Sequence, residues 1–184
     1  MQARLLPART NGLHGHNLGS MTHDADDTRD EAQLREALRR RFIVDVALEE
    51  AWAQLADVRA WPTWAPHIRR VTVEPDAPLG PSSTGTLALA GGLRATFRMA
   101  AWDPPRRWAW VGRSGGLTIH YDHLFEPATS DSTTLTWVVA LSGPGSRLAL
   151  RPFAAIYGRN VDRAVPRLQA RLRDPGPGPG QRLP

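Results

Sequence analysis

The chain contains no cysteine and no lysine. Without cysteine, the chain cannot form disulfides, thiolate nucleophiles or cysteine-ligated zinc sites, and a reducing cytoplasm is compatible with this composition. All 23 basic residues are arginine, a bias that a GC-rich genome explains together with the abundant Ala, Gly and Pro. No uninterrupted apolar run approaches the roughly 18 residues that a transmembrane helix requires. We therefore expect no stable membrane insertion.

The net charge of +5 does not by itself identify a partner. Nucleic acids and anionic membranes attract basic proteins, but the arginines are scattered and no helix-turn-helix or zinc-finger pattern is present. The first residues, Met1 to Arg4, lack the apolar core of a signal peptide. These observations predict a soluble, cytoplasmic protein that binds no nucleic acid and is a monomer or weak dimer.

The length of 184 residues favours one domain with two tails. We predict an arm over residues 1–38, disordered or partly helical, a folded domain over 39–173 and a flexible Pro/Gly tail over 174–184. In the arm, Met21 is an alternative start, and Thr28 and Glu31 have the spacing of a capping box. Either a short helix through Leu34 and Leu38 or a solvated lead-in follows them.

The middle of the chain has the two-residue period of strands with one apolar face. Short links rich in Gly, Pro, Asp and Ser separate these segments, which predicts antiparallel hairpins that cover a core on one side. Seven strands are expected, at about 42–46, 71–73, 85–89, 94–101, 107–113, 118–126 and 134–142.

Two further segments have helical patterns. Residues 49–56 form about two turns with acids at the start, and Pro62 predicts a turn that bends Trp61 away from helical geometry. From about Ser146 to Arg173, apolar residues recur every three or four positions. Pro152 fits this last helix only in or before its first turn, and Pro166 is expected to kink it.

Several of these segments resemble one known family. The resemblance rests on Asp57 to Trp64 after a strand and a helix, and on Gly85, Trp102 to Trp108, His123 to Phe125, Thr134 to Trp137 and Ser142 to Pro144. In this order they resemble the polyketide cyclase/dehydrase and lipid-transport family, which is START-like and part of the SRPBCC superfamily. The resemblance covers roughly Arg40 to Arg173 and implies an α+β helix-grip fold, like that of the birch-pollen allergen. In that fold a seven-stranded antiparallel sheet wraps around a long C-terminal helix and leaves a cavity.

The strand phases then predict which side chains face the cavity. The predicted ligand-binding residues are mostly aromatic and suit a hydrophobic, lipid-like or polycyclic small molecule. The alternative is that they pack the domain core. They are Trp64, Phe97, Met99, Trp110, Tyr121, His123, Trp137 and Tyr157, with Trp61 or Trp64 near an entrance.

Three inward residues could perform chemistry. A cyclase needs hydrogen-bond donors and a general base, and His123 as base with Tyr121 or Tyr157 as donor could supply them. The strand phases place no Arg or carboxylate inward to orient His123, so the sequence favours binding over catalysis. His120 and His123 point to opposite faces of a strand, and His14, His16 and His23 could hold a metal only adventitiously; we expect no metal and no cofactor.

Three functions remain open from the sequence. The apolar pocket favours a carrier or sensor of a hydrophobic molecule, and the family resemblance with the Tyr/His set favours a polyketide cyclase or dehydrase. A growth-regulating, partner-binding module is the third. Its support is the arginines spaced by four along the last helix, for which a solvated surface is the favoured interpretation: Arg159, Arg163, Arg167 and Arg171.

Overall fold

The structure is a computed structural model that describes residues 34–75, 79–114 and 116–174. All of these residues belong to one compact unit. The predictions for residues 1–33, including the alternative start and the capping box, lie outside the described residues. So does most of the predicted Pro/Gly tail.

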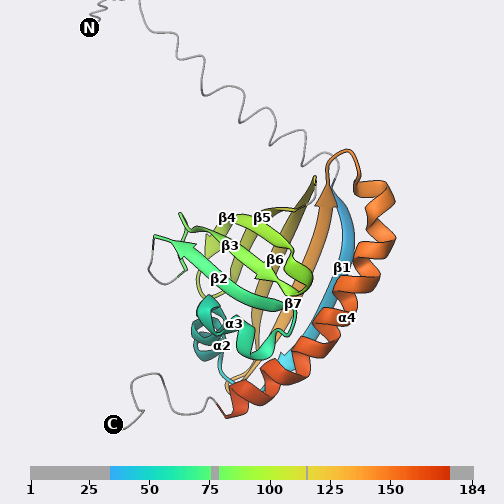
Figure 1. The fold of residues 1–184 in the computed structure, drawn as a ribbon. Coiled ribbons are helices and arrows are strands. Elements are labelled where there is room, and N and C mark those ends of the chain that lie inside the picture. The colour runs from blue at the N-terminus through green and yellow to red at the C-terminus, as the bar shows by residue number, and fades with distance from the viewer. Residues whose placement is uncertain (1–33, 76–78, 115, 175–184) are drawn as a thin grey trace, which may run out of the picture. The chain divides into compact units, whose positions relative to one another are not determined.

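Seven strands form a single sheet in the order β1-β7-β6-β5-β4-β3-β2, and every neighbouring pair is antiparallel. Together with the long C-terminal helix, this sheet confirms the predicted helix-grip fold class (Figure 1). The strands are β1 (Arg35–Val44), β2 (Ile68–Glu74), β3 (Thr84–Leu89), β4 (Arg94–Asp103), β5 (Arg107–Ser114), β6 (Leu117–Thr129) and β7 (Ser132–Ser142).

The first strand begins earlier than the sequence pattern indicated. β1 pairs with β7 from Arg35, opposite Leu141, to Val44, opposite Thr133. Both alternatives for the segment through Leu38, a short helix or a solvated lead-in, are therefore wrong from Arg35 on, and the expected boundary between residues 38 and 39 falls inside β1. Arg40 hides the pattern, because it lies in phase with the buried Leu38 and Val44 but carries a charge. A register shift between Glu36 and Leu38 also interrupts the alternation.

Two short helices follow β1 and place two tryptophans. α2 (Leu48–Ala56) matches the predicted helix, and a 3₁₀ turn, η1 (Val58–Ala60), leads into α3 (Trp61–Trp64). Trp61 has helical backbone angles, φ −53° and ψ −39°, so the expected departure from helical geometry is wrong. Pro62 is tolerated because it lies in the first turn, where its missing N–H leaves no hydrogen bond unmade. The Trp61 indole N–H donates to the Leu55 carbonyl at 2.9 Å and fixes the ring.

The long helix α4 (Ser146–Arg173) has the predicted bounds. Pro152 lies inside the helix rather than in or before the first turn, and α4 continues past it and past Pro166. Each proline removes one backbone hydrogen bond, and tertiary packing must offset that loss. The packing is extensive on one face, where Val161, Ala164 and Leu168 are buried.

Polar contacts attach α4 to the edge strand β1, beside which it lies in Figure 1. Arg40 donates to Asp162 at 2.8 Å, and the Gln169 amide donates to the Ile43 carbonyl at 2.7 Å. These contacts set the position of α4 against the sheet. None of the described helices is long and apolar enough to cross a membrane.

The aromatic core lies between α2 and the sheet. Trp108 of β5 has no exposed surface, and the Trp52 ring of α2 contacts it edge-on with centroids 4.8 Å apart. The Trp52 ring also contacts the rings of Trp102 and Phe125, with centroid distances of 5.0 and 5.3 Å. Trp108 of this cluster also lines the cavity described next.

Candidate functional site: an aromatic cavity between the sheet and the last helix

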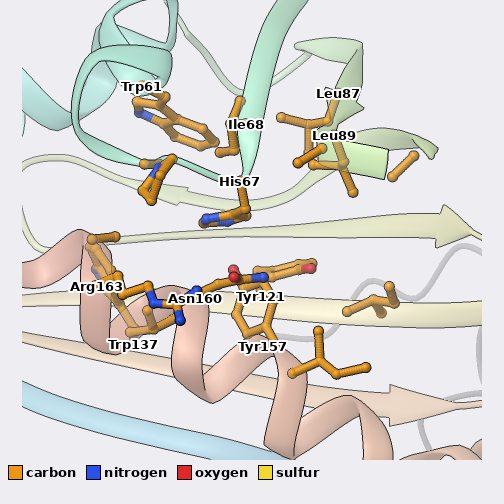
Figure 2. Close-up of a pocket in the computed structure, with 18 of the residues that line it drawn as sticks. Trp61, His67, Ile68, Leu87, Leu89, Tyr121, Trp137, Tyr157, Asn160 and Arg163 are labelled. Atoms are coloured by element: carbon orange, nitrogen blue, oxygen red, sulfur yellow. The ribbon is translucent and has the colours of Figure 1, made fainter. Parts of the chain in front are cut away.

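A cavity of about 720 Å³ separates the sheet from α3 and α4. Its walls come from the inner face of strands β3 to β7, from α3 and the segment that follows it, and from one face of α4. Figure 2 shows Trp61, His67, Leu87 and Leu89 on one side of the space, and Tyr157 and Asn160 on the other. The lining is largely apolar and aromatic, which is typical of a site for a small molecule.

Most of the residues predicted to bind ligand line this cavity. Trp61 does so as well, while Phe97 and Met99 do not. Both are buried, and the Phe97 ring packs against that of Trp110, with their centroids 5.4 Å apart. On β4 it is Ala95 that reaches the cavity. Binding itself stays a prediction for the six predicted residues that line it, Trp64, Trp110, Tyr121, His123, Trp137 and Tyr157.

Tyr121 and Tyr157 join the sheet to α4. Their hydroxyls lie within hydrogen-bonding reach of each other, and their ring centroids are 5.6 Å apart. Burial raises the pKa of both phenols above the ordinary value of 10.0, so both stay protonated at neutral pH. Each hydroxyl carries one hydrogen, and the pair uses only one internally. One hydroxyl hydrogen is therefore free to donate to a ligand acceptor.

His123 lies on the inner face of β6, opposite Trp137 on β7. The centroid of its ring lies 5.3 Å from that of the Trp108 ring and 5.7 Å from that of the Trp137 ring. Burial among these rings lowers the pKa of His123 from 6.5 to about 3, because the charged form loses its hydration. The imidazole is therefore neutral at pH 7.

His120 is not part of the cavity lining. It makes a hydrogen bond with the Ser142 hydroxyl at 2.9 Å. In the described part of the chain, no group of three or more His, Asp or Glu side chains is placed to hold a metal ion.

His67 was missed in the sequence analysis. It follows α3 and lines the cavity, with its ring 5.7 Å from that of Tyr157. Burial lowers the pKa of His67 from 6.5 to about 4. The available signal was its position three residues after Trp64, because Trp61 or Trp64 was expected near an entrance of the cavity.

Three polar residues of α4 were also unexpected. Asn160, Arg163 and Arg167 line the cavity, so the expectation that no arginine faces it is wrong. That expectation considered only strand phases, whereas these arginines come from the helix that faces the sheet. The described lining contains no Asp or Glu.

The cavity wall also holds several nitrogen atoms without a hydrogen-bond partner among the described residues. A buried polar atom without a partner costs free energy, and the indole nitrogens among them can only donate. They have almost no accessible surface. They are Nε1 of Trp64, Trp108, Trp110 and Trp137 and Nδ1 of His67 and His123.

Curated relatives of the chain are found in mycobacteria. Uncharacterized proteins of Mycobacterium tuberculosis and Mycobacterium bovis are 30% identical to it over 142 residues, which cover 72% of this chain and 81% of theirs.

Solved structures share the fold at low sequence identity. The Zhui aromatase/cyclase of a Streptomyces species has a TM-score of 0.61 at 16% identity, covering 80% of this chain and 98% of that one. A START superfamily protein of Mycobacterium smegmatis has a TM-score of 0.57 at 15% identity, covering 77% of this chain and 100% of that one.

Residues 35–173 match the sequence pattern of a family described as polyketide cyclase/dehydrase and lipid transport. This segment contains every element from β1 to α4. Family and fold together indicate hydrophobic ligand binding or a cyclase-type activity. The chain belongs to the polyketide cyclase/dehydrase and lipid transport family.

Proposed function

We propose that the protein binds a hydrophobic small molecule, lipid-like or polyketide-like, as a carrier or sensor and does not transform it. The cavity of about 720 Å³ is large enough for such a ligand and is walled mainly by apolar and aromatic side chains. Burial of apolar surface contributes about 25 cal/mol per Å². A ligand of this kind would gain its affinity mainly from that burial.

The weak basicity of the cavity's histidines carries the choice of binding over catalysis. A general base works best when its pKa lies near the working pH. The pKa of His123 is about 3 and that of His67 about 4, so both are weak bases at pH 7. Among the described lining residues no carboxylate is present that could raise either value or take the proton instead.

A polyketide cyclase or dehydrase is the second candidate. The Tyr121–Tyr157 pair favours it, because a protonated phenol can donate to a carbonyl and polarise it. The similarity to the aromatase/cyclase fold is compatible with this function. A cyclase would also need a general base, and the described lining residues include no base whose pKa lies near 7.

A fluorescence titration with the neutral probe N-phenyl-1-naphthylamine tests the binding function. Ala164 lines the cavity, and Ala155 is exposed elsewhere on the same helix. Ala164→Phe should fill part of the cavity and weaken probe binding by about tenfold or more, or ~1.4 kcal/mol. Ala155→Phe, the matched control, should leave the affinity unchanged. Equal affinities in the two variants would contradict binding in this cavity.

His123→Phe separates the carrier from the catalyst. In a carrier the substitution replaces the neutral imidazole by an apolar ring of similar size. Probe affinity should therefore stay within about tenfold, or ~1.4 kcal/mol. In an enzyme the loss of a general base typically costs about 10²–10⁴-fold in rate. A poly-β-keto substrate whose cyclisation is lost in His123→Phe, while its affinity survives, would overturn the carrier function.

A further inference from the structure

The cavity opens beside a pair of arginines on α4. Arg163 and Arg167 are four residues apart, both are exposed, and both line the cavity. Residues at this spacing share one face of a helix. Figure 2 shows Arg163 beside Asn160 and Trp137 at one end of the space. Part of the cavity rim is therefore cationic.

Within the described residues, neither arginine of this pair takes part in an ion pair. The nearest acid in sequence, Asp162, faces the other way and pairs with Arg40 of β1 at 2.8 Å. Arg173, in the last turn of α4, pairs with Asp45 at 3.1 Å. Since the described lining contains no carboxylate, the cavity itself offers Arg163 and Arg167 no counter-charge.

The rest of the exposed rim is apolar. Leu93, between β3 and β4, and Ile156 on α4 both line the cavity, and each is 62% exposed. Along α4 the exposed lining residues therefore change from Ile156 to Arg163 and Arg167, with the half-buried Asn160 between them, whereas Val161 and Ala164 line the cavity from buried positions. One part of the rim suits hydrocarbon and the other suits an anion.

We propose that Arg163 and Arg167, with the Asn160 amide, form an anion subsite, so that the ligand is an amphipathic acid. This inference rests on the proposed binding function. Its apolar body occupies the aromatic cavity and its acidic group stays at the rim, in contact with water. Burying an isolated carboxylate in the apolar interior would be costly, whereas guanidinium groups bind carboxylates, sulfonates and phosphates through paired hydrogen bonds. Because both arginines are exposed, the expected effect is modest, at about two- to fivefold for each arginine.

The test compares two probes with the same aromatic body. 1-Anilinonaphthalene-8-sulfonate carries an anion, and N-phenyl-1-naphthylamine is the same molecule without it. The double variant Arg163→Gln/Arg167→Gln should weaken binding of the sulfonate by about 4- to 25-fold and leave the neutral probe within about twofold. Dodecanoate should displace the neutral probe less effectively from this double variant than from the parent protein. Dodecanol, which has no charge, should displace it equally well from both.

A second double variant controls for the loss of two positive charges. Arg147 and Arg151 have the same spacing on α4, are exposed and do not line the cavity. Arg147→Gln/Arg151→Gln should leave both affinities within about twofold. Circular dichroism and unfolding midpoints should confirm that both double variants fold like the parent protein.

The outcomes separate the two proposals. Binding of the neutral probe that Ala164→Phe does not weaken would overturn the proposed function. The anion subsite alone would be overturned if the neutral probe binds in the cavity but the affinity for the sulfonate probe falls equally in the two double variants. If the subsite is correct, rising salt should weaken sulfonate binding more in the parent protein than in Arg163→Gln/Arg167→Gln, because salt screens exposed charges.

Discussion

The rings of Trp110 and Tyr121 stack with centroids 3.8 Å apart and planes 17° apart. The two residues are direct partners on neighbouring strands, β5 and β6. Through its hydroxyl, Tyr121 then reaches Tyr157 on α4. A stacked aromatic pair on the sheet is thus coupled to the helix across the cavity, and this coupling holds two walls of the site together.

The hydrogen bond between Tyr121 and Tyr157 should be visible in a double-mutant cycle. Tyr121→Phe keeps the stacked ring but removes the hydroxyl, which should lower the free energy of unfolding by about 1 kcal/mol. Tyr157→Phe should cost a similar amount, and the double variant should cost less than the sum, because both single changes remove the same bond. Urea unfolding measures all four proteins. Strictly additive losses would show that the two hydroxyls do not interact.

Stability should fall as the pH drops below about 6.5. The pKa of His123 is about 3 in the folded protein and near 6.5 when exposed, so between these values the unfolded chain binds a proton that the folded protein excludes. The stability is therefore complete above about pH 6.5 and is lost progressively towards pH 3. The slope for this one group approaches 1.4 kcal/mol per pH unit, or about 2 kcal/mol between pH 7 and 5.

His123→Phe should remove about half of the combined slope of the two buried histidines over the same interval, because His67, with a pKa of about 4, contributes nearly as much between pH 7 and 5. Hydrogen bonds from Arg39 and Arg40 lower the pKa of Glu36 and Asp162, and these carboxylates lose their contribution only at more acidic pH. Unfolding midpoints measured between pH 7 and 5 therefore isolate the histidines. An unchanged pH dependence in His123→Phe would contradict the buried, neutral imidazole.

Gly85 should tolerate no side chain. A Cβ atom there would overlap the Thr72 carbonyl oxygen and lie 2.6 Å from Cε1 of Phe97. Gly85→Ala should lower the free energy of unfolding by about 1–3 kcal/mol, as overpacking does in well-packed cores. Gly145→Ala is the control, since its Cβ would meet only Leu117 at 3.7 Å. Equal stability of the two variants in urea would show that β3 can shift to make room.

The central strands were predictable because their pattern is local. A strand alternates faces with a period of two, so the phase of Tyr121, His123 and Trp137 followed from the sequence, and all three reach the cavity. The bounds of α4 followed in the same way from a helical period that a Gly-Pro-Gly segment precedes. The family resemblance supplied how these elements are arranged.

The extent of β1 could not be predicted, because its inner face contains Arg40, whose partner Asp162 lies 122 residues away. The depth of the cavity was equally hidden. Phe97 and Ala95 share one face of β4, but only Ala95 reaches the cavity. Strand phase determines the face of a residue, whereas the elements packed opposite decide whether it meets an open space or a neighbouring side chain.

The sequence by itself determined the seven strands, the last helix and the aromatic character of the inner face, since each depends on local periodicity and residue type, while the fold class followed from the family resemblance. Only the tertiary structure decided that Arg163 and Arg167 border the cavity and that His67 enters it. It also decided that His123 is buried, which lowers its pKa well below the ordinary value of 6.5. These properties depend on which distant segments meet, and on how much water they exclude, and no local pattern contains that information.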